Sequence, residues 1–122
     1  VVCLESADSG RKAAAVDAGV HVWELPGDRG QIDWCAFCER CAREAVCGVY
    51  IECGPSLATE VIESGKVDYL FIYKAPKFMA DLATPGIGSR RATSSMQDAL
   101  SLADVQHAIL GDDVLTRGRL VR

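Results

Sequence analysis

The alternation of short apolar runs with helix-forming segments most constrains what this chain can fold into. The runs 1–5, 21–26, 48–55 and 66–76 have the length and the apolar content of β-strands. Segments with helical spacing separate these runs, an order that is typical of an α/β sheet covered by helices. Because 49% of the 122 residues are apolar, we expect one compact domain with a core rather than two domains.

Capping residues set the limits of the first two predicted helices. Asp8 or Ser9 can cap a helix that follows the first strand, and Gly19 can end it. Asp33 is a good cap for a second helix, which we expect to run to about Ala45.

The remaining segments predict a long strand, loops and a terminal hairpin. The run 66–76 is too continuously apolar to face water on one side, so we expect it to be a central strand. The segment 27–31 and the polar, glycine-containing segment 81–99 are predicted to be loops. The segment 102–121 has strand composition on both sides of Gly111, which predicts an antiparallel hairpin.

The charge and the apolar runs of the chain argue against nucleic acid and membrane partners. The net charge is −4, so no cationic surface is expected that could replace the counterions around a nucleic acid. No apolar run approaches the ~18 residues of a membrane span, and residues 1–10 lack the features of a signal peptide. We therefore expect a cytoplasmic protein whose cysteines stay reduced.

Cysteines at a strict three-residue spacing raise the question of a metal site. Cys35, Cys38 and Cys41 lie on the second predicted helix, where a rise of about 1.5 Å per residue spreads them over roughly 9 Å. The thiolates of one zinc site must lie within roughly 4 Å of each other. No glycine or proline between Gln31 and Cys47 breaks the helix, so we predict no metal ligands here.

The same cysteines fit a packing role on one face of the helix. We expect Cys38 and Cys41 to pack as small hydrophobic side chains in a buried stripe, with charged residues on the outer face. A cysteine-ligated metal module stays open as an alternative, although the fourth cysteine and the proline of iron–sulfur ligand runs are missing at the expected place. The expected stripe is Trp34, Phe37, Cys38, Cys41 and Ala45, and the expected outer face is Glu39, Arg40, Arg43 and Glu44.

The junction between the third predicted strand and the next helix carries the clearest chemical signal. Pro55 suits the first position of a helix over 55–64. A helix that opens directly from a strand presents free backbone N–H groups and a positive dipole end, which together form a seat for a phosphate. Gly54 lets a ligand approach the backbone, Ser56 adds a hydroxyl donor, and Glu52 can accept hydrogen bonds from a substrate. By itself, such a junction is more often only a turn.

The resemblance to a known family rests on three segments, YIECGPSLA, GKVDYLFIYKAPK and LGDDVLTRGRL. Together they resemble the reductase domain of the bifunctional riboflavin-biosynthesis deaminase/reductase, which carries a Glu-Gly-Gly-Pro loop, a strand leading to Ala-Pro-Lys and a Gly-x-Asp-Val hairpin in the same order. The resemblance implies a dihydrofolate-reductase-like α/β fold with a mixed, mostly parallel sheet, flanking helices and a C-terminal antiparallel hairpin. It also implies that residues 1–122 are the C-terminal part of the reductase domain, incomplete at the N-terminus.

The resemblance further implies an NADPH-dependent oxidoreductase. Its substrate would be the phosphoribosylaminouracil intermediate of riboflavin synthesis, whose ribosyl group is reduced to a ribityl chain. By position, Glu52 would contact the substrate, whereas no catalytic residue is assigned. The implied partner is a fused or separate N-terminal deaminase, and we expect a homodimer because an open domain gains from pairing. The residues implied to line the cofactor are Gly54, Pro55, Ser56, Leu57, Ala58, Thr59 and Glu60.

Departures from the family pattern leave a rival interpretation open. Cys53 replaces a glycine of the family loop, Tyr69 replaces a glutamate, and Ala80 replaces a glycine. The rival is a non-catalytic domain fragment or assembly module that binds no nucleotide. The weaker candidate residues, which are more often caps, spacers or solvated charges, are His21, Asp68, Lys77, Arg90, Arg91 and His107.

Overall fold

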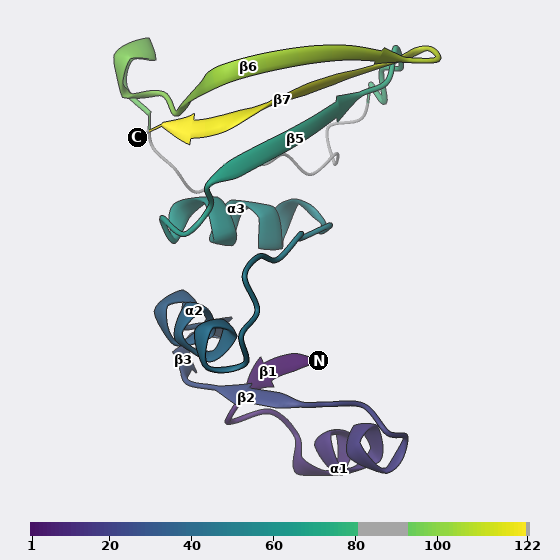
Figure 1. Ribbon diagram of the computed structural model, residues 1–122, viewed down its shortest axis with the longest axis vertical. Helices are drawn as coiled ribbons and strands as arrows, with labels where there is room; N and C mark the ends of the chain where they lie inside the picture. The colour runs from purple at the N-terminus through teal and green to yellow at the C-terminus, as the bar shows by residue number, and fades with distance from the viewer. Residues whose placement is uncertain (81–92, 122) are drawn as a thin grey trace. The chain divides into compact units, whose positions relative to one another are not determined.

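The computed structural model describes residues 1–80 and 93–121, which combine α-helices with small β-sheets (Figure 1). The chain divides into two compact units, Val1–Glu52 and Cys53–Arg122. The predicted α/β class is confirmed by this mixture of elements. Among the described residues, no helix is both long and apolar enough to pass through a membrane.

The first unit opens with two parallel strands joined by a helix. Strand β1 (Val2–Leu4) pairs with β2 (Trp23–Leu25), and helix α1 (Ser9–Asp17) connects them. The Asp8 carboxylate caps α1 by accepting a hydrogen bond from a backbone N–H of the first turn at 2.8 Å. Gly19 follows the helix with a φ of +79°, which glycine adopts without strain. The strands and the helix agree with the sequence-based predictions.

A short antiparallel hairpin forms where the sequence predicted a loop. Strands β3 (Gly27–Asp28) and β4 (Gln31–Ile32) pair across a two-residue turn. Arg29 and Gly30 in this turn have φ values of +51° and +81°, the pair of left-handed conformations that a type I′ turn requires. The Arg-Gly pair is a weak sequence signal for such a turn, because residues other than glycine seldom take a positive φ.

Helix α2 (Trp34–Arg43) carries the spaced cysteines and begins where predicted. The Asp33 carboxylate caps it by accepting hydrogen bonds from the N–H groups of Cys35 and Ala36 at 2.7 and 3.2 Å. The helix ends slightly before the predicted limit, and Ala45 follows with a φ of +56°.

The predicted packing of the cysteines is only partly correct. Cys41 is buried, with 8% of its surface exposed, but Cys38 and Ala45 are exposed. The guanidinium of Arg40, which was expected on the outer face, lies 5.2 Å from the ring centroid of Trp23 in a cation–π contact. Arg40 is thus half-buried, whereas Cys38 is exposed.

The predicted strand over 48–55 does not form in the described chain. Residues 46–54 belong to no strand or helix, and Val49 and Tyr50 are 51% and 64% exposed. A strand is stable only when a neighbouring strand pairs with its backbone, and none of the described strands pairs with this segment. The local composition predicted a strand, but the pairing partner is missing among the described residues.

The second unit is a helix followed by a three-stranded antiparallel sheet. Helix α3 (Pro55–Glu63) leads into β5 (Tyr69–Lys74), and a 3-10 turn at Met96–Asp98 precedes β6 (Ser101–Leu110) and β7 (Asp113–Val121). The order in the sheet is β5-β7-β6 (Figure 1). The predicted helix and the predicted C-terminal antiparallel hairpin are confirmed.

The central position predicted for the run 66–76 is wrong within the described sheet. Its strand β5 lies at an edge, because it pairs only with β7, and all its residues except Leu70 are exposed. Among the described ladders, the pair of β1 and β2 is parallel and the others are antiparallel. Of the loop predicted over 81–99, residues 81–92 lie outside the described residues.

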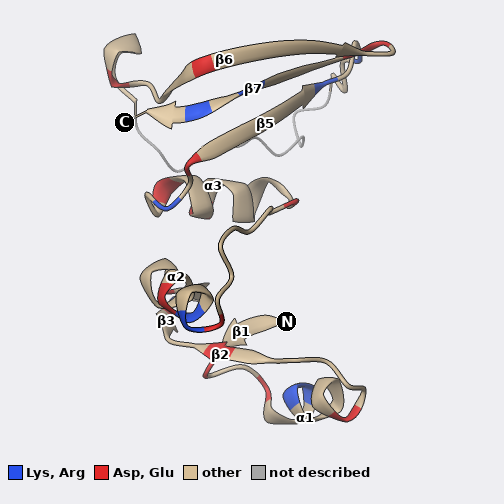
Figure 2. Cartoon of the chain, viewed as in Figure 1, with Lys and Arg blue, Asp and Glu red and all other residues tan. Residues whose placement is uncertain are grey.

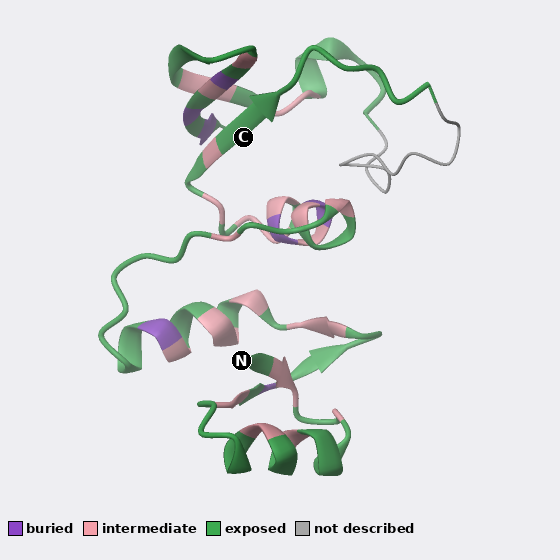
Figure 3. Ribbon diagram, turned by 90° about the vertical axis from the view of Figure 1, so that its right-hand side faces the viewer, coloured by how far each residue is buried: buried purple, intermediate pink, exposed green. Residues whose placement is uncertain are grey.

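Few described side chains are buried in either unit (Figure 3). The buried apolar residues are Leu25 and Cys41 in the first unit, and Val61, Leu115 and Leu120 in the second. The strand ladders therefore contribute much of what holds the elements of each unit together.

A β-bulge interrupts strand β6 opposite Gly118. The register shifts between Ala103 and Gln106, because three steps along β6 correspond to two steps along β7. Asp104 lies inside the bulge with a φ of +53°, and its carboxylate is 3.3 Å from the Nε atom of Arg119. A Cβ atom on Gly118 would lie 2.8 Å from the carbonyl oxygen of Ala103, which is too close for an unstrained contact. Packing of the sheet thus requires glycine at this position.

We expect Gly118→Ala to destabilise the second unit by about 1–3 kcal/mol, because the added methyl group forces the backbone at the bulge to move. Gly48→Ala is the matched control, since nothing lies within 4 Å of its Cβ position. Urea unfolding followed by circular dichroism measures the free energy of unfolding of each variant. Equal unfolding midpoints for Gly118→Ala and the parent chain would contradict the close approach.

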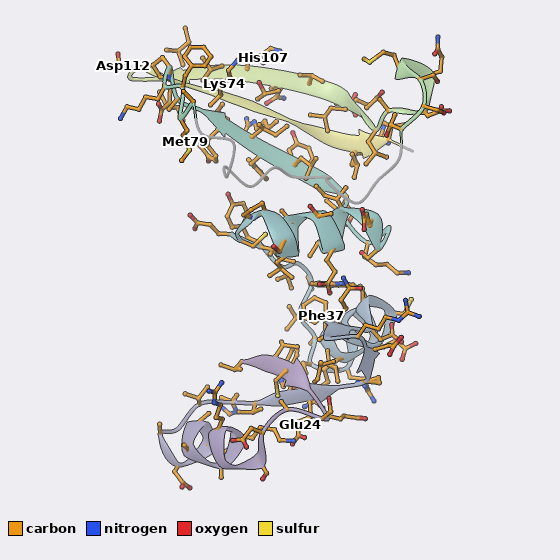
Figure 4. The ribbon with its side chains drawn as sticks, turned by 180° about the vertical axis from the view of Figure 1, so that it is seen from behind. Glu24, Phe37, Lys74, Met79, His107 and Asp112 are labelled. Atoms are coloured by element: carbon orange, nitrogen blue, oxygen red, sulfur yellow. The ribbon has the colours of Figure 1, made fainter. Side chains whose placement is uncertain are left out.

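Lys12 ties helix α1 to strand β2. Its ammonium group donates hydrogen bonds to the Glu24 carboxylate at 2.6 Å and to the Glu5 carbonyl at 3.0 Å (Glu24 is labelled in Figure 4). The hydrogen bond with Glu24 is the main reason why the pKa of Lys12 is raised above its ordinary value of 10.5, and partial burial of the side chain opposes this effect. The folded chain therefore binds this proton more tightly than the unfolded chain.

A lysine with a raised pKa stabilises the folded chain below pH 10.5 and loses this contribution as the pH rises through the folded-state pKa. We therefore expect the difference in Tm between the parent chain and Lys12→Met to be largest near neutral pH and to shrink above pH 10.5. Thermal unfolding over a pH series measures this difference, with Lys66→Met at an exposed position as the control. A difference that stays constant with pH would contradict the role of the Lys12 proton.

Candidate functional site

The candidate site begins at Gly54, the N-cap residue of helix α3. Gly54 has a φ of −72° and a ψ of 171°, an extended conformation, and no side chain caps the helix. Pro55 follows at the first helical position, where its fixed φ suits the helix and its missing N–H removes no helical hydrogen bond. The Gly-Pro pair therefore produces the abrupt helix start that the sequence predicted.

Two backbone N–H groups are available at this helix start. The first hydrogen bond inside the helix runs from the Ala58 N–H to the Gly54 carbonyl at 3.0 Å. The N–H groups of Ser56 and Leu57 precede it, and within the described part of the chain they meet no acceptor. Both residues are exposed, and the first turn carries no acidic residue (Figure 2). The positive end of the helix dipole is thus open to an anion.

The space beside Gly54 is open. A Cβ atom placed on Gly54 would have no neighbour within 4 Å, and the φ of this residue lies outside the left-handed region. Neither backbone conformation nor packing of the described residues therefore requires glycine here. The absence of a side chain does keep the approach to the N–H groups of the first turn free.

Another face of α3 anchors the helix. Thr59 is 2% exposed, and its hydroxyl donates a hydrogen bond to the Pro55 carbonyl at 2.8 Å. Val61 is also buried, with 6% of its surface exposed. Of the other residues predicted to line the cofactor, Ala58 and Glu60 are half-buried. The helix thus combines an anchored face with an exposed start.

The strand composition of 48–55 places Glu52 at the end of a predicted strand, beside the helix start, but no strand forms there. Glu52 is exposed and ends the first unit, two residues before Gly54, in the segment without regular structure. The expected place of its carboxylate beside the phosphate seat depended on the strand over 48–55, which does not form.

An open hollow of about 440 Å³ lies in the first unit, and the sequence had predicted no site at its lining residues. None of the predicted site residues lines it. In the described part of the chain, no group of three histidine, cysteine, aspartate or glutamate side chains gathers to hold a metal ion. The hollow is lined by Pro26, Gly27, Asp28, Gln31, Ile32 and Asp33.

Two of the weaker candidates, His107 and Asp68, make ordinary structural contacts. The Nδ1 atom of His107, labelled in Figure 4, lies 3.0 Å from the hydroxyl of a threonine in the paired strand. The Asp68 carbonyl accepts a hydrogen bond from the Leu120 N–H at 2.9 Å. The predictions for Arg90 and Arg91 lie outside the described residues.

Comparison with known proteins identifies a family model over nearly the whole chain. The model of the RibD C-terminal domain matches residues 1–116. The riboflavin biosynthesis protein RibD of Escherichia coli (strain K12) is 26% identical over 92 residues, which make up 74% of this chain and 24% of that protein. The chain thus spans about a quarter of the length of this relative.

Solved structures share the fold of the whole chain. A pyrimidine reductase-like protein from Corynebacterium diphtheriae matches with a TM-score of 0.72 at 22% identity, and the match covers 100% of this chain and 50% of that one. RibD from Acinetobacter baumannii matches with a TM-score of 0.73 at 16% identity, and the match covers 100% of this chain and 31% of that one. At these identities the likeness concerns the fold.

We expect Thr59→Val to destabilise the second unit by about 1 kcal/mol, because the variant keeps the shape of the side chain but loses the hydroxyl that bonds to Pro55. Thr93→Val, at an exposed position outside any helix, is the matched control. Urea unfolding of both variants measures the loss. A Thr59→Val variant as stable as the parent chain would show that this hydrogen bond does not stabilise the second unit.

Proposed function

The chain belongs to the family of the RibD C-terminal domain, and from this membership we propose that it forms the cofactor-binding portion of an NADPH-dependent reductase of riboflavin biosynthesis. The proposed reaction reduces the ribosyl group of the phosphoribosylaminouracil intermediate to a ribityl chain.

The open start of helix α3 is the observation that carries this proposal. Two backbone N–H groups, at Ser56 and Leu57, precede the first bond of the helix, and no acidic side chain in the first turn competes with an anion. The helix dipole adds a positive partial charge at the same place. A pyrophosphate such as that of NADPH fits these features, and the open space beside Gly54 supports the fit.

Each residue of the helix start then has a defined task. NADPH, when bound, supplies the hydride, so the protein contributes binding and orientation. The N–H groups of Ser56 and Leu57 would hold the pyrophosphate, and burial of the Thr59 side chain would keep the helix in position. Ala58 and Glu60 would line the cofactor beyond the first turn, and Glu52 would contact the substrate.

Broader features of the proposal concern the protein beyond this helix. We include in it the mostly parallel sheet of a dihydrofolate-reductase-like fold, which the likeness to RibD structures supports. A deaminase, fused or separate, would act with the reductase, since the relative from Escherichia coli is about four times as long as the matched segment. A homodimer and a cytoplasmic location complete the proposal.

A second candidate function is an assembly module that binds no nucleotide. Several large apolar side chains of the second unit are exposed, and binding of a partner chain would remove them from water. Phe78 is 97% exposed, Ile109 is 81% exposed and Tyr73 is 56% exposed.

Titration with NADPH tests the role of the helix start directly. We expect Gly54→Trp to bind NADPH at least about tenfold more weakly than the parent chain, which corresponds to about 1.4 kcal/mol, because the indole fills the space beside the N–H groups. Gly48→Trp is the matched control, since its Cβ position is also open and it lies outside the helix. Fluorescence titration measures both affinities.

Two outcomes would count against the proposal in different ways. Equal NADPH affinity of Gly54→Trp and Gly48→Trp would remove the helix start from the cofactor site. A parent chain whose Tm does not change at any NADPH concentration would favour the assembly module, because a ligand that binds only the folded state must raise the Tm.

A further inference from the structure

Helix α2 exposes two cysteines that neither packing nor the proposed reductase function explains. Cys35 and Cys38 are exposed, whereas Cys41 further along the helix is buried. Phe37, labelled in Figure 4, stands between them in the sequence. Two exposed thiols at Cys-x-x-Cys spacing near the start of a helix are typical of dithiol redox sites.

We propose that Cys35 and Cys38 form a redox-active dithiol, which a low-molecular-weight disulfide such as oxidised glutathione converts into a disulfide within helix α2. The proposal is independent of the reductase function, because it uses neither the helix start at Gly54 nor NADPH.

The Cα positions of an α-helix bring these two residues close to bridging distance, and a local shift that shortens the Cβ–Cβ distance from about 5–6 Å to about 4 Å completes the bridge. For two residues three positions apart, a rise of about 1.5 Å per residue and a Cα radius of about 2.3 Å give a Cα–Cα distance of about 5 Å. Disulfides span Cα–Cα distances of about 4.4–6.8 Å, so Cys35 and Cys38 lie within range. The same geometry separates Cys35 and Cys41 by about 10 Å, which excludes a bridge between them.

Cys41 is the weaker partner for Cys38, although it also lies three positions away. Burial raises the pKa of the Cys41 thiol, and the nearby Cys38 raises it further. A thiol with a raised pKa is less often the thiolate that attacks a disulfide.

The first turn of α2 can also adjust to a bridge more easily than the middle of the helix. The Cys35 N–H donates to the Asp33 carboxylate at 2.7 Å and not to a backbone carbonyl. When Cys35 shifts toward Cys38, its N–H therefore has no backbone hydrogen bond to lose.

Oxidised glutathione is the only oxidant that this thiol–disulfide exchange requires. The Cys35 thiol loses its proton, its sulfur attacks one sulfur of oxidised glutathione, and the first glutathione leaves as a thiolate that takes up the proton. The Cys38 sulfur, after losing its own proton, attacks Cys35 in the mixed disulfide and releases the second glutathione as a thiol. Two protein thiols are oxidised to one disulfide, and one glutathione disulfide is reduced to two thiols. Because the bridge is exposed and closes a very short loop, dithiothreitol should reverse it readily.

Equilibration of the full chain with mixtures of oxidised and reduced glutathione tests the proposal, followed by acid quenching, alkylation and mass spectrometry. We expect the parent chain to lose two hydrogen atoms in mass and to lose alkylation at Cys35 and Cys38 together. Cys38→Ser should lose the bridge completely and carry glutathione on Cys35 instead. Cys47→Ser and Cys53→Ser, at the other exposed cysteines, are the matched controls and should form the bridge as the parent chain does.

Two results would overturn the proposal. One is a parent chain in which Cys35 and Cys38 are alkylated or glutathionylated independently at every glutathione ratio, with no loss of hydrogen. The other is a bridge that persists in Cys38→Ser, which would assign it to other cysteines. Circular dichroism of each variant before oxidation establishes that the helix is intact.

Discussion

The second unit depends on the two antiparallel ladders that β7 makes with β5 and β6. Strand β7 also supplies Leu115 and Leu120, two of the few buried apolar side chains of this unit. The N–H of Leu120 binds the Asp68 carbonyl just before β5 begins, and a short connection through Gly65 joins β5 to helix α3. The pairing of β5 with β7 therefore fixes the position of the chain just after helix α3, and α3 carries the candidate site.

The start of α3 can attract an anion because groups that would hinder an anion are absent from it. Gly54 contributes no side chain, Pro55 contributes no N–H, and the first turn carries no acid. Two donors and the dipole remain, while the buried Thr59 holds the helix from another face. Any anion of suitable size would be attracted to such an element. Under the proposed function, this anion is the pyrophosphate of NADPH.

Local signals in the sequence predicted most elements, because caps and turns act over a few residues. Asp8, Asp33 and the Gly-Pro pair located the helix starts, and the glycine-centred turn located the C-terminal hairpin. The short hairpin at Arg29 was missed, since arginine is an unusual residue for a left-handed turn.

Features that depend on distant segments could not be predicted in the same way. The strand composition of 48–55 does not reveal whether another strand is present to pair with this segment. In the same way, the apolar composition of β5 does not reveal that this strand lies at the edge of its sheet. The contact of Arg40 with Trp23 joins residues far apart in the chain, and local periodicity could not predict either this contact or the exposure of Cys38. The open helix start was predicted from sequence, whereas the place of Glu52 depended on the strand that does not form.

The bulge in β6 has a consequence for how the length of this protein can vary. Pairs on both sides of the bulge are regular, with Ala103 opposite Arg119 and Gln106 opposite Arg117. A chain that lacked Asp104 would therefore keep all these pairs in register and would only lose the extra residue. Gly118 would then face one residue of β6 instead of the two that now oppose it, and the two strands would pair without a bulge.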